Sequence, residues 1–325
     1  MERKYLFEAG LNVYTSYKTI IPVEHLKELE QIDTHKYHIY GILAYPKIYF
    51  KNDKVYTDKE GIHICLFCPT ENNKEYMLPV WKISDDIDYS KVKIKQIYPY
   101  SKMILTIEDK AFLESHPEVV NESITLVAQE LFGVFAEGLI SKQEFEVLYI
   151  GQAYGQYGER TAFTRLSAHS TLQKILTDCQ TKYSDKHIYI ILLEFTPILN
   201  MTFDGLSKQY TMSEDVSDQH MNDVITNLPE EQQIINITEA AIINYFKPEY
   251  NVNFVENFPD ENHRGYKQYF DLDYNCLTVE FDLEFNNAPT IQLYSSKNRI
   301  NSSFDFIRYE LFNDNNRLNM YDIFK

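Results

Sequence analysis

Two stretches of the chain are almost continuously apolar and have the length of a buried strand. Phe145 to Ile150 ends directly before Gly151, and His187 to Phe195 has a similar composition. Runs of this kind indicate strands that are covered on both faces. A glycine at the end of such a run favours a turn. A third stretch, His38 to Tyr45, is rich in β-branched and aromatic residues and also predicts a strand.

Other stretches place their apolar residues at helical spacing. Between Asn121 and Ile140, apolar residues recur every three or four positions, and Ser123 is a suitable N-cap. A long helix is expected to begin near Pro229 and to end before Pro248, because proline suits a first turn and restricts the residue ahead of it. Further helices are predicted from Val23 to Gln31, Thr161 to Asp178 and Ser213 to Leu228.

The remaining composition indicates β-rich regions at both ends. Tyr (26) and Phe (20) are abundant while Trp occurs once, and β-branched and aromatic residues favour strands. We therefore expect an α+β protein: residues 1–100 as a β-rich domain suited to recognition, 101–255 as a central domain, and 256–325 as an acidic, aromatic, β-rich region. Strands are predicted at Lys47 to Phe50, Ile62 to Cys68, Val92 to Ile97, Leu277 to Phe285 and Thr290 to Leu293, and a helix or strand at Phe304 to Phe312.

Five residues of the central region have side chains suited to phosphodiester cleavage. Tyr149 closes the first apolar strand, Arg165 and His169 are four residues apart on the predicted Thr161 to Asp178 helix, Glu239 lies in the long helix, and Asn251 follows it. The four-residue spacing predicts that the guanidinium and the imidazole share one helix face and reach the same phosphate.

These residues resemble the motifs of the GIY-YIG nuclease superfamily. The ordered elements are Tyr149-Ile150-Gly151, Arg-x-x-x-His on the next helix, a helical glutamate, and Pro248-x-x-Asn251, from about Phe145 to Asn251. The resemblance implies a three-stranded antiparallel sheet with flanking helices. It also implies that Tyr149 activates water, that Arg165 holds the phosphate, that His169 carries a proton and that Asn251 supports the site.

The first motif of the family, Gly-Ile-Tyr on a strand, has no clear counterpart near the second. Gly133-Val134-Phe135 stands at nearly the right distance, but it falls inside the helical pattern and lacks the tyrosine. We therefore expect Lys102 to Ile107 to form the first strand, with a helix inserted before the second and a degenerate first motif.

Glu239 is the residue that most strongly indicates a metal site. Ile235, Ile242, Ile243 and Phe246 place it on or beside the apolar face of its helix. A buried carboxylate normally has a partner or a metal, and Mg²⁺ (or Mn²⁺) binds through one carboxylate and several waters. The structural alternative is an ion pair between Glu239 and Arg165.

The other candidate residues also have structural alternatives. Tyr149 could instead be an ordinary aromatic residue of a strand. Arg165 and His169 could instead form the polar face of a surface helix. Asn251 has the alternative of a turn residue. Cys65 and Cys68 have the spacing of a zinc knuckle, and His63 is close. A structural zinc site needs four ligands, however, and Cys179 and Cys276 lie far along the chain, so Cys65 and Cys68 are better interpreted as buried small residues.

The charge of −17 complicates a nucleic-acid substrate, since proteins that bind nucleic acid broadly usually have basic surfaces. Three explanations remain: basic residues gathered in one cleft, a charge-compensating metal, or a protein partner. We expect a cytoplasmic protein with no membrane association. Its expected function is that of an endonuclease in restriction or phage defence, with DNA favoured over RNA as the substrate. It would act alone, as a homo-oligomer or with a protein partner. The alternative is a non-catalytic module of the same fold that binds a protein.

Overall fold

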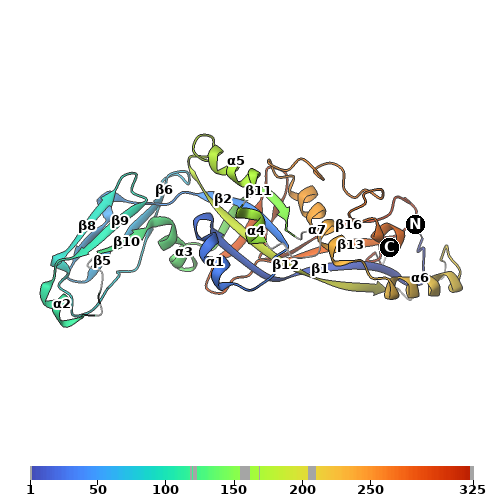
Figure 1. Cartoon of the computed structure of the whole chain (residues 1–325), viewed down its shortest axis with the longest axis horizontal. Helices are drawn as coiled ribbons and strands as arrows, with labels where there is room; N and C mark the ends of the chain where they lie inside the picture. Colours follow the sequence, from blue (N-terminus) through green and yellow to red (C-terminus); the bar gives the residue numbers. More distant parts are fainter. Residues whose placement is uncertain are drawn as a thin grey trace.

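An eight-stranded mixed sheet forms the centre of the molecule (Figure 1). The computed structural model describes residues 2–117, 119, 123–153, 162–167, 169–203 and 210–322. The strand order is β15-β14-β11-β2-β12-β1-β13-β16. The strands are β1 (Glu8–Pro22), β2 (Ile39–Pro46), β11 (Lys142–Gln152), β12 (Lys186–Thr202), β13 (Cys276–Asp282), β14 (Thr290–Tyr294), β15 (Arg299–Ile300) and β16 (Phe304–Glu310).

Three antiparallel strands, β11, β2 and β12, are the most apolar part of this sheet because both of their faces are covered. Alternate residues of β2 divide between two hydrophobic cores. Ile39 and Leu43 belong to the larger core, whereas Tyr40 and Ile42 belong to a smaller one on the opposite face. The alternation of side chains along a strand therefore decides which residues reach which face.

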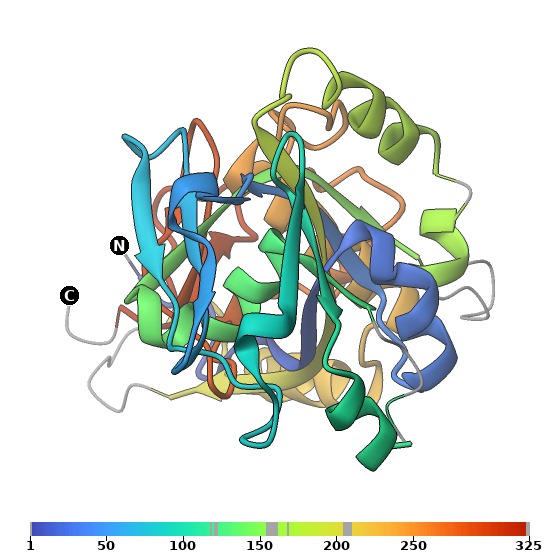
Figure 2. The ribbon, with the colours of Figure 1, turned by 90° about the vertical axis from the view of Figure 1, so that its left-hand side faces the viewer.

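The helices near the candidate residues lie on different parts of the sheet. Buried side chains of α4 (Ala162–Ser167) and α5 (Ser170–Asp178) belong to the smaller core, and leucines of α1 (Leu26–Ile32) pack against it. Figure 2 shows these three helices on the same side of the molecule. The long helix α7 (Glu231–Phe246) instead contributes its apolar residues to the larger core. Further helices are α6 (Glu214–Thr226) and α8 (Gln268–Asp271).

A smaller lobe of short strands extends from the sheet at one end (Figure 1). Its strands are β3 (Tyr49–Phe50), β4 (Tyr56–Asp58), β5 (Gly61–His63), β6 (Cys65–Cys68), β7 (Lys74–Met77), β8 (Val92–Ile97), β9 (Lys102–Ile107) and β10 (Ser123–Val127). The short helix α2 (Lys110–Ser115) follows β9, and α3 (Ala128–Leu139) leads back to β11. Cys65 and Cys68 are buried free thiols, in agreement with their interpretation as small core residues.

The α+β class is confirmed, but the predicted domain boundaries at residues 100 and 255 do not separate the strands. Strands β1 and β2 come from the first range, β11 and β12 from the second, and β13 to β16 from the third, yet all share one sheet. The larger core also extends without interruption from Leu66 and Met103 in the small lobe to Val279 in β13. Pairing between distant segments thus joins regions that composition alone divides.

Two local predictions need correction. Lys102 to Ile107 is a strand, but it pairs with β8 and β10 in the small lobe and not with β11. The strand between β11 and β12 is β2, more than a hundred residues ahead of the Tyr149 segment. The Asn121 to Ile140 segment begins as strand β10 and becomes helical only at Ala128, while Asn121 itself lies outside the described residues.

Within the described part of the chain, none of the helices combines the length and the apolar character needed to span a lipid bilayer.

Candidate functional site

A β-bulge in β11 turns Tyr149 toward the smaller core. Val147 pairs with Leu43 and Tyr149 with Ile42, so Leu148 is the extra residue. Phe145, Val147 and Ile150 therefore pack in the larger core, whereas Leu148 and Tyr149 both face the smaller one. Bulges of this kind re-aim side chains near functional sites.

Tyr40 of β2 lies beside Tyr149 on this face. The two ring centroids are 6.2 Å apart, and Tyr40 is fully buried. Gly151 pairs with Tyr40 across the strands, and a Cβ built on it would lie 2.7 Å from the Tyr40 Cζ and Oη atoms. The glycine after Ile150 is therefore required by the packing of a second tyrosine over the strand.

Arg165 and His169 approach these tyrosines from two short helices. Arg165 lies in α4, and His169 is the N-cap residue of α5. The predicted single helix from Thr161 to Asp178 is therefore wrong at His169, whose backbone is extended, and Thr161 lies outside the described residues. The two side chains share one site because of this break and not because they share a helix face.

His169 is buried and neutral in this position. Its Nδ1 atom accepts a hydrogen bond from the Leu172 backbone N–H at 3.2 Å, and its ring lies 5.1 Å from the ring of Tyr149. Burial lowers the pKa of His169, and the charge of Arg165 lowers it further. Because Nδ1 is an acceptor, the single ring proton lies on Nε2.

Arg165 is the cation common to the whole group. Its charge lowers the pKa of His169 and opposes the burial that raises the pKa values of Tyr40, Tyr149 and Glu239. The side chain is exposed. Among the described residues, no carboxylate lies within the 4.0 Å that defines an ion pair with its guanidinium, so the structural alternative of an Arg165–Glu239 pair does not hold.

Glu239 projects from α7 toward the end of β11. Burial raises its pKa to about 7, while hydrogen bonding from the side chain and backbone of Gln152 and the charge of Arg165 act in the opposite direction. The Glu239 carboxylate in turn adds to the effect of burial in raising the pKa of Tyr149. A carboxylate with this pKa is only weakly compensated by the groups around it.

A chain of amides fixes how Gln152 faces Glu239. The Gly265 carbonyl, which can only accept, receives a hydrogen bond of 2.9 Å from the Asn236 side-chain nitrogen. The Asn236 oxygen must then face Gln152, and it accepts from Gln152 Nε2 at 2.6 Å. Gln152 therefore presents its amino group to this part of the site. The Gly265 carbonyl thus determines, through Asn236, the orientation of the Gln152 side-chain amide beside Glu239.

Asn251 supports the strand that carries Tyr149. Its side-chain oxygen accepts from the Ile150 N–H at 2.9 Å, and its nitrogen donates to the Ile150 carbonyl at 2.8 Å. Strand β14 pairs with β11 only from Lys142 to Glu146, so the amide occupies an edge that no strand covers. Asn251 contacts the backbone and is a positioning residue.

The structure brings all five predicted residues into one group and adds three that the sequence did not single out: Tyr40, Gln152 and Asn236. Tyr40 lies in the predicted strand His38 to Tyr45. Its Ile39-Tyr40 pair matches the last two positions of Gly-Ile-Tyr, and this was the available signal. No sequence signal identified Asn236, because its role depends on a carbonyl 29 residues away.

The donor set fits a hard divalent cation. One weakly compensated carboxylate, Glu239, stands beside phenol hydroxyls and a cation that has no ion-pair partner among the described residues. Mg²⁺ typically binds through one or two carboxylates, waters and substrate phosphate oxygens. Asp58, Glu60 and His63 also lie within 4.8 Å of one another by their ligand atoms, but they belong to the small lobe and are mostly exposed.

Comparisons with models of protein families, with curated proteins and with solved structures find no match to this chain.

Proposed function

We propose that this protein is a metal-dependent endonuclease that hydrolyses phosphodiester bonds of nucleic acid at a GIY-YIG-like site. The observation that carries the proposal is the convergence of Tyr40, Tyr149, Arg165, His169 and Glu239, which come from β2, β11, α4, the start of α5 and α7. Residues with these chemical roles, drawn from separate elements into one group, are typical of a catalytic site.

The position of Tyr40 adds support to the resemblance. The family pairs a strand bearing Gly-Ile-Tyr with one bearing Tyr-Ile-Gly. In this chain, His38-Ile39-Tyr40 leads into β2, which pairs antiparallel with the strand of Tyr149-Ile150-Gly151. The first motif then departs from the family in having histidine where glycine is usual and in lying more than a hundred residues ahead of the second motif.

Each of these side chains has a separate role in the proposed hydrolysis. The exposed Arg165 guanidinium binds a nonbridging phosphate oxygen and stabilises the charge of the pentavalent transition state. His169 carries its proton on Nε2, because Nδ1 accepts a hydrogen bond from the Leu172 N–H, so the proton-carrier role expected from the sequence falls to the Nε2–H group. Tyr149 orients the attacking water and accepts its proton only as the phenolate, after releasing its own proton to solvent; burial and Glu239 raise the pKa of Tyr149, and the charge of Arg165 opposes that rise.

Glu239 would hold the metal, with Gln152 directing its carboxylate. When bound, Mg²⁺ or Mn²⁺ would polarise the phosphate and offset the negative charge of Glu239. The metal also offers one explanation of how a chain with a charge of −17 accepts a polyanion. A role in restriction or phage defence is a further part of this proposal and rests on analogy.

The test is a cleavage assay with plasmid DNA and structured RNA, with Mg²⁺, with Mn²⁺ and with EDTA. Metal-dependent cleavage that is lost in Arg165→Ala and Glu239→Ala is the expected result. Degradation that is equal in all three proteins and independent of metal would overturn the proposal and favour the non-catalytic, protein-binding alternative.

A further inference from the structure

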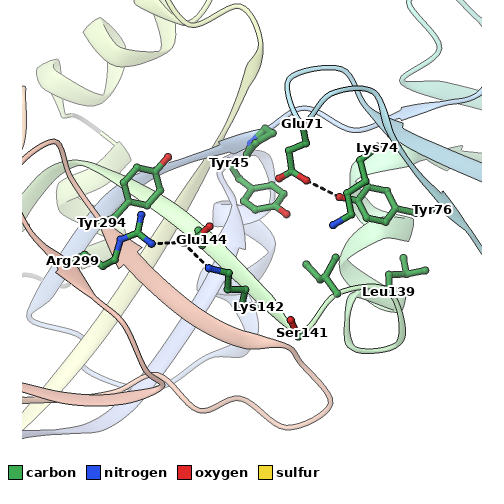
Figure 3. Close-up of a pocket in the computed structure, with 12 residues that line it drawn as sticks. Tyr45, Glu71, Lys74, Tyr76, Leu139, Ser141, Lys142, Glu144, Tyr294 and Arg299 are labelled. Atoms are coloured by element: carbon green, nitrogen blue, oxygen red, sulfur yellow. Dashed lines mark hydrogen bonds and ion pairs between the residues drawn. The ribbon is translucent and has the colours of Figure 1, made fainter.

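A second site lies where the small lobe meets the large sheet. An open cavity of about 710 Å³ is lined there by four segments that are distant in the sequence: the end of β2, the β6–β7 hairpin, the α3–β11 connection and the β14–β15 hairpin (Figure 3). This volume is within the range of about 300–1,000 Å³ that small-molecule sites occupy. Nothing in the proposed nuclease reaction uses this cavity.

The cavity carries more positive than negative side chains, in a chain with a net charge of −17. Lys74, Lys142 and Arg299 line it together with two carboxylates, Glu71 and Glu144. Glu144 already binds two of the cations, Lys142 at 3.3 Å and Arg299 at 2.5 Å. Two cations that share one carboxylate leave a surplus positive charge on this wall.

The opposite wall carries one ammonium group, Lys74, and one carboxylate, Glu71, which do not pair with each other. Lys74 Nζ lies 5.1 Å from the centroid of the Tyr76 ring, and no carboxylate of the described residues pairs with it. The nearby Glu71 instead accepts a hydrogen bond of 2.9 Å from the Tyr76 hydroxyl. Figure 3 shows the Lys74 and Lys142 amino groups on opposite sides of the cavity, with the Tyr45 hydroxyl between them.

We propose that this cavity binds a small phosphate-bearing molecule. Its oxygens would accept from Lys74 on one wall and from Lys142 and Arg299 on the other, with Tyr45 as a neutral donor. A ligand held this way joins the β7 hairpin of the small lobe to β11 and β15 of the large sheet. Tyr45 and Tyr40 are five residues apart on β2, roughly 16 Å at strand spacing, and they face different cores. The two sites are therefore distinct.

Isothermal titration calorimetry of the whole chain in EDTA, with inorganic phosphate, pyrophosphate and ADP as probes, tests the proposal. We expect at least one probe to bind, with affinity weakened roughly tenfold or more in Lys74→Glu and Lys142→Glu, as the reversal of one charge contact implies. Lys82→Glu, an exposed lysine of the same lobe, is the matched control and should bind normally. Arg165→Ala should also bind normally, since it alters only the nuclease site.

Absence of binding by all three probes would overturn the proposal. Binding that is unchanged in both cavity variants would also overturn it, and so would binding that is lost in Arg165→Ala, because the anions would then occupy the nuclease site. Circular dichroism of each variant establishes that it is folded. None of these readouts depends on cleavage, so the nuclease proposal can fail while this one stands.

Discussion

The side-chain amide of Asn251 hydrogen-bonds to both backbone groups of Ile150, as a neighbouring strand would. This contact holds β11 where Tyr149 leaves the bulge and Gly151 passes beneath Tyr40. The loop after α7 is therefore part of the support of the site, although it supplies no group to the reaction.

Replacement of Asn251 should affect stability and cleavage together. Asn251→Ala leaves the N–H and the carbonyl of Ile150 without their partner, at a cost of about 1–3 kcal/mol in the free energy of unfolding. Asn251→Asp keeps the acceptor but places a carboxylate against the Ile150 carbonyl, so it should be no more stable than Asn251→Ala. Urea unfolding measures both, and wild-type stability in both variants would contradict the support role.

Gly151 should tolerate a methyl group better when Tyr40 is removed. In Gly151→Ala the new Cβ would lie 2.7 Å from the phenol of Tyr40, so we expect a loss of about 1–3 kcal/mol from overpacking. Adding Tyr40→Ala removes two of the three close contacts and leaves the one of 2.8 Å with the Tyr149 ring, so the double variant should be more stable than the sum of the two single effects predicts. A double-mutant cycle by thermal or urea unfolding measures this coupling, and strict additivity would show that the two residues are not in conflict.

His169 combines two roles that a single substitution can separate. His169→Asn preserves a capping acceptor for the Leu172 N–H but removes the Nε2 donor, so stability should change little while cleavage falls. His169→Ala loses both roles and should be less stable by about 1 kcal/mol. Thermal unfolding and single-turnover cleavage distinguish the two effects, and normal cleavage by His169→Asn would exclude the donor role.

The carboxyl of Glu239 should make stability depend on pH in the absence of metal. Its pKa rises from an ordinary 4.5 to about 7 on folding, so the folded chain binds this proton more tightly. The stabilisation of the folded state by this proton is fully present below pH 4.5, the pKa in the unfolded chain, and is lost as pH rises through about 7, the pKa in the folded chain. We expect a decrease of about 3 kcal/mol in the free energy of unfolding across this range, and a flatter profile in Glu239→Gln. Urea titrations in EDTA at several pH values measure it, and parallel profiles would contradict the prediction.

Much of the fold was accessible from local sequence patterns. The strands at His38 to Tyr45 and His187 to Phe195 were predicted from composition, as were the helices that became α6 and α7. These elements depend on propensity and periodicity, which short stretches of sequence carry. The five candidate residues are also predictable from the sequence, because the order of their motifs along the chain does not depend on the fold.

The pairing of β2 with β11 was missed because it depends on long-range contacts. Proximity in the sequence favours Lys102 to Ile107 as the partner of the Tyr149 strand, but this strand pairs within the sheet of the small lobe. The bulge at Leu148 was also not visible, because a bulge is defined by the register with a partner. The break at His169 is not visible in the sequence, because Phe163, Leu166, Leu172 and Ile175 keep helical spacing across it.

The most direct test of the central claim is the cleavage rate of a labelled nucleic-acid substrate in Mg²⁺ by Glu239→Gln, measured beside Glu214→Gln. Glu214 is an exposed carboxylate in the first turn of α6, so both variants lose one negative charge and only one of them alters the site. We predict that Glu214→Gln cleaves like wild type and that Glu239→Gln is slower by roughly a hundredfold or more, the size typical for loss of a transition-state stabilising group. Equal rates in the two variants would show that Glu239 has no part in catalysis and would contradict the account.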